Sequence, residues 1–290
     1  MDLVLDAADQ HFFTPYIYPS TWPESDIWRQ LLSLYAITVA GGYFLYLSLS
    51  SLSYFFIYDK KLMEHPQYLP NQVSLEIGYT LFSVPFMAVL TVPLFALEVN
   101  GYSKLYDDVD STVGWIFVVI SMGTFLFFTD MMIYFIHRGL HHRLVYKHIH
   151  KPHHKWKVPT PYASHAFHPV DGFLQSSPYH IYPFLFPLHK LTYLGLFVFV
   201  NIWTISIHDG DYRVPLLLRP FVNGSAHHTD HHTFFDCNYG QFFTLWDRIG
   251  RSFRSPTGFE GKSPRDEVYR NTKKAQRDNR SVAELNGKLE

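Results

Sequence analysis

Long stretches without a charged residue divide the first half of the chain into three apolar segments. No Asp, Glu, Lys or Arg occurs at residues 30–58, 77–97 or 111–129, and the third segment continues past Asp130 as far as residue 136. A helix that crosses a membrane needs about 20 mostly apolar residues. The pattern therefore predicts three membrane helices, because three buried helices of a soluble domain of this size would rarely all reach that length.

A fourth uncharged stretch, at residues 191–207, follows an apolar segment that contains several prolines. Residues 172–207 together predict a helical hairpin that either spans the membrane or re-enters it. Proline removes a helical hydrogen bond, so Pro178, Pro183 and Pro187 are expected to break the first arm. The predicted fold is an all-α integral membrane protein with about four to five membrane helices and a cytosolic, histidine-rich helical metal domain.

These patterns divide the chain into four parts. Residues 1–29 form an N-terminal segment, residues 30–136 carry three membrane helices, and residues 137–251 form the histidine-box catalytic region with its hairpin. Residues 252–290 are polar and charged, and they are expected to form a cytosolic tail outside the catalytic fold. The first 16 residues carry acids where a secretory signal peptide has basic residues, so no signal peptide is predicted.

Basic residues between the apolar segments set the expected orientation. Lys60 and Lys61 follow the first segment, and six basic residues follow the third. Cytosolic loops carry an excess of lysine and arginine, so the first loop, the histidine region and the tail are expected in the cytosol, with the N-terminus across the membrane. The six residues are Arg138, Arg143, Lys147, Lys151, Lys155 and Lys157.

Histidine is concentrated in one part of the chain. The 290 residues include 18 histidines, of which only His11 and His65 lie outside residues 137–232. The net charge of −1 argues against a broad nucleic-acid surface. Cys237 is the single cysteine, which excludes an intrachain disulfide and a Cys-x-x-Cys metal site.

Three short motifs hold most of these histidines. His137 and His141 are four residues apart at the end of an apolar segment, so on a helix they would share one face. Imidazoles spaced in this way can reach one metal ion, and a metal ion holds crowded imidazoles neutral. His142 and His227 suit an ordinary surface or core position equally well. The predicted metal ligands are His137, His141, His142, His150, His153, His154, His208, His227, His228, His231 and His232, with His165 and His168 as candidate metal or substrate contacts.

The type and number of ligands limit the choice of metal. Imidazole suits iron, zinc, copper and nickel, and this many ligands exceeds the four of one zinc ion, so two metal ions are favoured. The chain contains neither the Glu-x-x-His of soluble diiron bundles nor the His-Glu-x-x-His of zinc proteases. Spacing alone leaves both iron and zinc open.

Carboxylates and aromatic residues near the motifs are candidates for supporting roles. Asp130, Asp230 and Asp247 are predicted to orient ligand imidazoles by accepting their other N–H, although Asp130 also suits a helix end and Asp247 a pair with Arg248. Nearby aromatic residues could form an apolar substrate pocket, or simply pack in the core or anchor the protein at the membrane interface. They are Tyr134, Trp203, Phe234, Phe235 and Trp246.

The order of the histidine motifs after apolar segments resembles the membrane fatty acid hydroxylase superfamily, and longer strings narrow the resemblance. Those strings are FFTDMMIYFIHRGLHHRLVYKHIHKPHH, PTPYASHAFHPVDGFLQSSPYHIYPF, NIWTISIHDGDYRVP and NGSAHHTDHHTFFDCNYGQFFTLWDRIG. They are similar to the sterol C5-desaturases of that superfamily. The resemblance covers nearly the whole chain and ends near residue 265.

This resemblance implies an activity. It implies an oxidoreductase of the endoplasmic reticulum membrane that uses O₂ to introduce the C5–C6 double bond of a Δ7-sterol, converting lathosterol to 7-dehydrocholesterol in cholesterol biosynthesis. It also implies two non-haem irons, held by the histidines of the three motifs with His208, and electrons from NADH through cytochrome b5. The basic residues after residue 137 could steer cytochrome b5 to the site, although the same charges suit the cytosolic face of a membrane protein.

Two other classes of protein fit the same histidines. A sister diiron lipid hydroxylase or sterol C4-methyl oxidase would yield a hydroxyl group in place of a ring alkene. A zinc-binding membrane hydrolase or a metal transporter would hold zinc, and a transporter would also place polar groups within its membrane spans. The histidines here lie at the ends of the apolar segments and in loops.

Overall fold

The three long apolar segments fold as three long helices. The computed structural model describes residues 1–286, and in it α2 (Ile27–Phe56), α3 (Gln72–Val99) and α4 (Thr112–Leu140) are long and apolar enough to cross a membrane. Asp26 begins α2 by accepting hydrogen bonds from two backbone N–H groups of the first turn. The prediction of three membrane-length helices is confirmed.

A shorter pair of helices forms the predicted hairpin at residues 172–207. Its arms are α6 (Pro169–Leu185) and α7 (Lys190–Ser206), and each has 17 residues. At 1.5 Å per residue each arm is about 26 Å long, so the arms are shorter than the three candidate spans. The turn contains β2 (Leu188–His189), which pairs in parallel with β1 (Leu105–Tyr106) ahead of α4.

The prediction that prolines break the first arm of the hairpin is wrong for two of the three. Pro178 and Pro183 both lie inside α6, and only the third proline lies beyond its end. Pro178 cannot donate to the carbonyl oxygen of Leu174, but the hydroxyl of Ser177 donates to it at 2.8 Å. Hydroxyl groups can satisfy carbonyls that a proline frees in a membrane helix.

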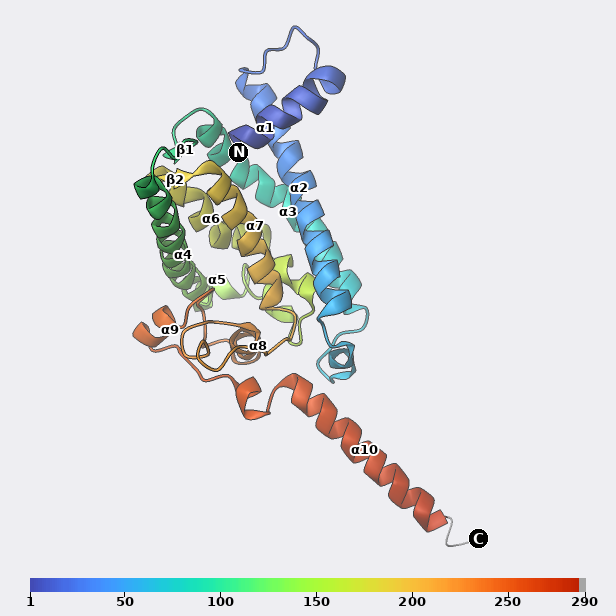
Figure 1. Cartoon of the computed structure of the whole chain (residues 1–290). Coiled ribbons are helices and arrows are strands. Elements are labelled where there is room, and N and C mark those ends of the chain that lie inside the picture. The colour runs from blue at the N-terminus through green and yellow to red at the C-terminus, as the bar shows by residue number, and fades with distance from the viewer. Residues whose placement is uncertain (287–290) are drawn as a thin grey trace.

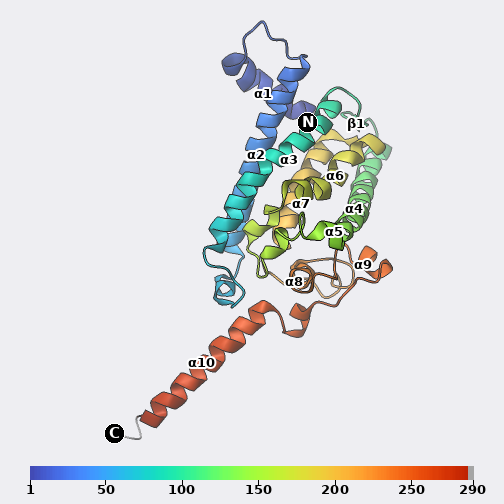
Figure 2. The same cartoon turned by 180° about the vertical axis from the view of Figure 1, so that it is seen from behind.

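The helices form one bundle (Figures 1 and 2), and the side chains on its outer surface are largely apolar. α2 packs on α3, α6 packs on both α3 and α4, and α7 contacts α2. Large apolar side chains on the outer faces are exposed, including Phe44 on α2, Phe82 on α3 and Val119 on α4. Such a surface is suited to lipid rather than to water.

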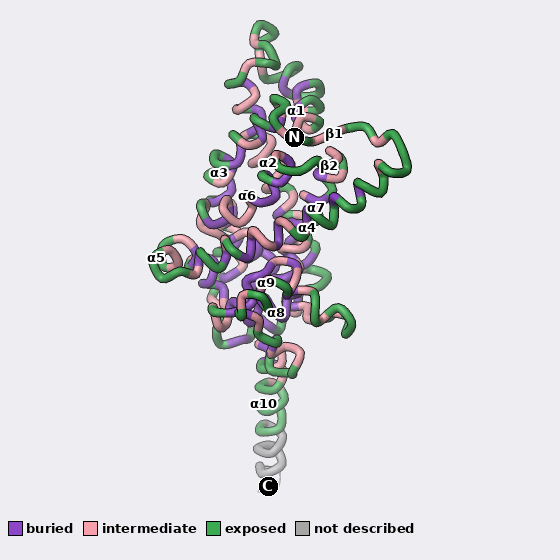
Figure 3. The backbone as a smooth tube through the Cα atoms, turned by 90° about the vertical axis from the view of Figure 1, so that its left-hand side faces the viewer, coloured by how far each residue is buried: buried purple, intermediate pink, exposed green. Residues whose placement is uncertain are grey.

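Shorter elements lie at the two ends of the bundle. One end carries α1 (Asp2–Ala8) and a π-helix at Asp9–Ile17. The other carries residues 141–168 and 207–263, called here the histidine cap, and the buried parts of the backbone gather there around α8 (Figure 3). The remaining elements are α5 (Arg143–Tyr146), α8 (Ser225–Phe234), α9 (Leu245–Ile249) and α10 (Pro264–Asn286), with 3-10 helices at Lys60–Glu64, His153–Lys155, Pro161–His165 and Thr257–Glu260.

The histidine cap continues past residue 252, where the sequence places the start of the tail. Thr257 donates two hydrogen bonds to Asp230 on α8, at 2.9 Å from its backbone nitrogen and at 2.6 Å from its hydroxyl. Ser252 donates to Asp247 on α9 at 2.8 Å. The chain therefore leaves the body only at α10, which extends away from it (Figure 1).

Candidate metal centre

Nine histidine side chains converge in the histidine cap as two groups. Within each group, the nitrogens that could bind a metal lie within 4.8 Å of one another. The sequence motifs do not correspond one to one with the groups, because the second and third motifs each contribute histidines to both groups. The first group is His137, His141, His150, His154 and His231, and the second is His153, His208, His228 and His232.

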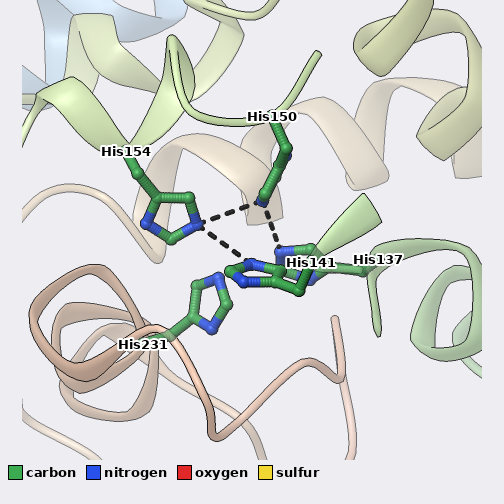
Figure 4. Close-up of side chains that lie close together, drawn as sticks. All are labelled: His137, His141, His150, His154 and His231. Atoms are coloured by element: carbon green, nitrogen blue, oxygen red, sulfur yellow. Dashed lines mark hydrogen bonds between the residues drawn. The ribbon is translucent and has the colours of Figure 1, made fainter. Parts of the chain in front are cut away.

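Helical spacing builds the first group. His137 lies in the last turn of α4 and His141 follows the end of that helix, so their rings project from one face. His150 and His154 repeat the four-residue spacing after α5, and His231 comes from α8. Nε2 of His154 lies 3.1 Å from Nε2 of both His141 and His150. Nε2 of His150 also lies 3.1 Å from that of His137, and Figure 4 shows all five rings close together.

The second group lies where α7 ends beside α8. His208 follows α7 closely, and His228 and His232 are four residues apart on α8. Nε2 of His228 lies 3.0 Å from Nε2 of His208 and 3.1 Å from that of His232. The ring of His153 completes the group, with its centroid 4.7 Å from that of His232.

Hydrogen bonds on the far side of four rings fix which nitrogen carries the proton. Nδ1 of His137, His208 and His231 donates to a backbone carbonyl at 2.7 to 2.9 Å, and Nδ1 of His150 donates to Asp171. A neutral imidazole with a proton on Nδ1 keeps a lone pair on Nε2. Nε2 of His231 is buried and has no hydrogen-bond partner among the side chains that the structure describes, at residues 1–278. Lone pairs converging at about 3 Å repel one another unless a cation lies between them, so both groups fit a metal ion.

Burial keeps these rings neutral, which is the form that binds metal. Burial lowers the pKa of His153, His154 and His228 well below its usual range, and neighbouring histidines lower it further. Burial also lowers the pKa of His208 to about 4, although its hydrogen bond to a backbone carbonyl acts in the opposite direction.

The carboxylate that contacts a histidine of the first group is Asp171, which the sequence analysis missed. It lies in the first turn of α6, and its Oδ2 accepts from Nδ1 of His150 at 2.7 Å. Neither side chain has exposed surface, and Gln175 donates to the other carboxylate oxygen at 2.7 Å. A carboxylate behind a ligand imidazole fixes the ring and makes it more basic. Asp171 is the single charged residue between residues 169 and 189, which was a signal available in the sequence.

The three carboxylates predicted to orient histidines contact other groups. Asp130 accepts from the backbone N–H groups of residues 241–243, and Asp230 accepts from a threonine beyond α8. Asp247 accepts from the backbone N–H of Tyr239 at 2.9 Å, and the carbonyl of Tyr239 accepts from Nδ1 of His137. Within the described residues none of the three carboxylates accepts directly from a histidine, so that expectation was wrong. Asp247 contacts His137 only indirectly, through the backbone of Tyr239.

Four of the predicted histidines lie outside both groups. His142 is exposed and begins α5, and His168 begins α6 in the same way. His227 is buried, and its Nδ1 accepts from a backbone N–H within the first turn of α8. His165 is partly buried, and its Nε2 donates to the side-chain oxygen of Asn201 at 3.0 Å.

A largely apolar cavity of about 480 Å³ lies within the bundle, with walls from α2, α3, α6 and α7. Its volume is in the range of small-molecule sites. Thr204 lines the cavity, and its carbonyl accepts from Nδ1 of His208, so the cavity approaches the second histidine group. Phe167, which also lines it, packs on the ring of His153 at 4.4 Å between centroids. The aromatic residues considered for a pocket, Tyr134, Trp203, Phe234, Phe235 and Trp246, are not among the described residues that line it.

This arrangement of an apolar helical bundle and two buried histidine groups defines a membrane-associated metalloprotein. The fatty acid hydroxylase family matches residues 122–252, the region that holds every histidine of both groups. Together with the relatives described next, this match places the chain in the fatty acid hydroxylase family.

The most informative relatives are sterol-modifying enzymes. A lathosterol oxidase of Mus musculus is 68% identical, with 94% of this chain and 92% of that protein covered. A lathosterol oxidase of Homo sapiens is 66% identical, with coverage of 91% and 89%. A Delta(7)-sterol 5(6)-desaturase of Schizosaccharomyces pombe is 54% identical, with coverage of 88% and 84%. The chain is an oxidoreductase of this desaturase group. No solved structure matches it.

Proposed function

We propose that the chain is a Δ7-sterol 5(6)-desaturase that converts lathosterol to 7-dehydrocholesterol. The observation that carries the proposal is the name shared by relatives that are 66% to 68% identical over nearly the whole chain. In the proposed reaction, C5 and C6 each lose a hydrogen and a double bond forms between them. These two hydrogens, two electrons, two protons and one O₂ leave as two molecules of water.

We propose that each histidine group holds one iron ion, and the spacing of its nitrogens supports this choice. Two nitrogens bound at about 2.1 Å from one metal lie about 3.4 Å apart at a tetrahedral angle and about 3.0 Å apart at a right angle. Five Nε2 pairs within the groups lie 3.0 to 3.1 Å apart, and all ligand nitrogens of a group lie within 4.8 Å of one another. Right angles are typical of five- or six-coordinate ions rather than of tetrahedral zinc. Bound iron would supply the activation of O₂ and the one-electron chemistry that C–H cleavage requires.

The side chains of the protein position and isolate the reacting groups. Asp171 and three backbone carbonyls hold four imidazoles in the tautomer whose Nε2 faces the metal. The cavity holds an apolar substrate away from water and close to the second histidine group. Holding an unreactive C–H bond at the reacting centre supplies much of the acceleration in such a site.

Electrons would come from NADH through cytochrome b5, at the exposed face of the histidine cap. Arg143 and Lys147 are exposed there between the first two histidine motifs, and Lys151 is exposed within the second. A basic patch attracts the acidic surface of an electron carrier and speeds their association. The proposed location is the endoplasmic reticulum membrane. The histidine cap and the C-terminus would lie in the cytosol, and α1 would lie on the opposite side of the membrane.

The test combines metal analysis with product analysis. The detergent-purified protein should contain iron at about two ions per chain. With NADH, cytochrome b5 and its reductase, it should convert a Δ7-sterol to the 5,7-diene under air and leave the sterol unchanged under nitrogen. A hydroxylated product would indicate a sister hydroxylase, and stoichiometric zinc with no oxygen-dependent product would overturn the proposal.

A further inference from the structure

The cavity is long, and its two ends differ in chemistry. Lys190 and Thr204 both line it and lie 14 positions apart on α7, which corresponds to about 21 Å along the helix. The end near Thr204 is called here the inner end, because the carbonyl of that residue binds His208 of the second histidine group. The end near Lys190 is called the outer end.

The inner end carries neutral hydrogen-bonding groups. Asn201 lies one turn before Thr204 on α7, and its side-chain oxygen accepts from Nε2 of His165 at 3.0 Å. One N–H of Asn201 donates to the carbonyl of Phe197 at 2.7 Å. Gln241 donates one N–H to the hydroxyl of Thr204 at 3.0 Å. An amide offers two N–H groups and an oxygen with two lone pairs, so both amides keep capacity for a ligand.

The outer end is charged and already paired. Nζ of Lys190 lies 2.6 Å from carboxylate oxygens of both Asp2 and Asp107. Hydrogen bonds between an ammonium group and a carboxylate are stronger than those to a neutral hydroxyl, so a sterol hydroxyl would not displace either carboxylate from Lys190. Tyr193, one turn after Lys190, and His180 also line the cavity, and they already hydrogen-bond to each other at 3.3 Å. The uncharged polar groups that lie beside the second histidine group are those of the inner end.

The chemistry of a 3-hydroxysterol connects the inner end's position near the second histidine group with the polar groups that it carries. The hydroxyl is on C3, in the same ring as C5 and only two bonds from it, whereas the alkyl tail leaves the opposite end of the ring system. A sterol that brings C5 and C6 toward the histidine groups must therefore bring its hydroxyl to the inner end of the cavity.

Resting on the proposed function, we propose that Asn201 and Gln241 bind the 3-hydroxyl of the substrate and so determine its orientation. His165 holds Asn201 in place through the Nε2 hydrogen bond. The sterol lies along α7 with its rings at the inner end and its alkyl tail toward Lys190. His165 is thus a positioning residue for substrate recognition, consistent with its place outside both histidine groups.

The test compares two ligands in the intact, iron-containing protein under nitrogen, where no turnover occurs. The ligands are a Δ7-sterol and its 3-deoxy analogue, and the quantity measured is the ratio of their dissociation constants. The unmodified protein should bind the hydroxylated sterol at least about 10-fold more tightly, as expected for a buried hydrogen-bonded hydroxyl. Asn201→Leu and Gln241→Met should each reduce that ratio to less than about threefold, by weakening binding of the hydroxylated sterol alone.

Lys190→Met is the matched control at the outer end, and it should keep the ratio of the unmodified protein. A ratio that collapses in Lys190→Met but persists in both inner variants would overturn the proposed orientation. Equal binding of the two ligands by the unmodified protein would also overturn it. Failure of the proposed function has a different signature, which is the absence of the 5,7-diene under air whatever the binding ratio.

Discussion

Replacing Asp171 by asparagine should loosen metal binding in one histidine group. The carboxylate accepts from Nδ1 of His150 at 2.7 Å in a pair with no exposed surface. The change keeps the shape of the side chain but removes the charge that strengthens this bond. Hydrogen bonds to charged groups contribute about 1.5–3 kcal/mol and neutral ones about 0.5–1.5 kcal/mol, so the expected loss is about 1–2 kcal/mol.

Such a loss corresponds to metal affinity lowered about 5- to 30-fold, which overlaps the range of about 10- to 100-fold found for outer carboxylates of metal sites. The assay incubates iron-loaded protein with increasing concentrations of a chelator and measures the iron retained per chain. In Asp171→Asn, about half of the iron should leave at a chelator concentration about 5- to 30-fold lower than the unmodified protein requires. The other half should be unaffected, because Asp171 contacts one histidine group only.

A buried carboxylate far from both histidine groups provides the matched control. Asp9 pairs with Arg29 at 3.1 Å at the other end of the bundle, and Asp9→Asn should lower thermal stability without changing the release of iron. If Asp171→Asn released its iron at the same chelator concentration as the unmodified protein, the carboxylate would have no role in holding His150, and the reasoning would be refuted.

Three further predictions concern ligands, protons and packing. His208→Gln should lower the iron content from two ions to one per chain, whereas the exposed His142→Gln should leave it unchanged, as elemental analysis would show. Burial lowers the pKa of His227 to about 4. Between pH 6.5 and 4 the unfolded chain therefore binds a proton at His227 that the folded one does not. As the pH falls, His227 alone should lower the free energy of unfolding by up to about 1.4 kcal/mol per unit, in addition to the effect of the other buried histidines. Thermal unfolding of chelator-treated protein at several pH values should show a shallower slope for His227→Gln, and an unchanged slope would contradict this. A Cβ on Gly250 would overlap side chains in the last turns of α4, so Gly250→Ala should lower the free energy of unfolding by about 1–3 kcal/mol in denaturation measurements. Gly195 has open space around it, so Gly195→Ala should change that free energy by less than about 1 kcal/mol.

The sequence predicted the parts of the fold that depend on local composition. The absence of charge over about 20 residues is a property of each segment alone, so α2, α3 and α4 could be located from it. The behaviour of α6 could not, because whether a proline ends a helix depends on other groups. In α6 the hydroxyl of Ser177 satisfies the carbonyl of Leu174 that Pro178 leaves free.

The convergence of the histidines was predictable, but their division into two groups was not. His150 and His153 are three residues apart, yet a short turn sends them to different groups. Asp171 was missed because its partner His150 lies 21 positions earlier and meets it only when α6 packs beside the cap. Asp130 was misjudged for the same reason, since its partners are backbone N–H groups of residues 241–243, which lie 111 to 113 positions later in the chain.

The interleaving of the motifs has a consequence for how the protein holds its shape. His154 and His231 belong to the same group although they are about 80 residues apart, and a metal ion bound by both would tie the two segments together. For a loop of that length, a cross-link raises the free energy of the unfolded chain by roughly 4–5 kcal/mol. This chain has a single cysteine and cannot form an internal disulfide, so bound metal is the cross-link that can join these segments. We therefore expect iron supply to govern how much folded protein a cell accumulates as well as how active each molecule is.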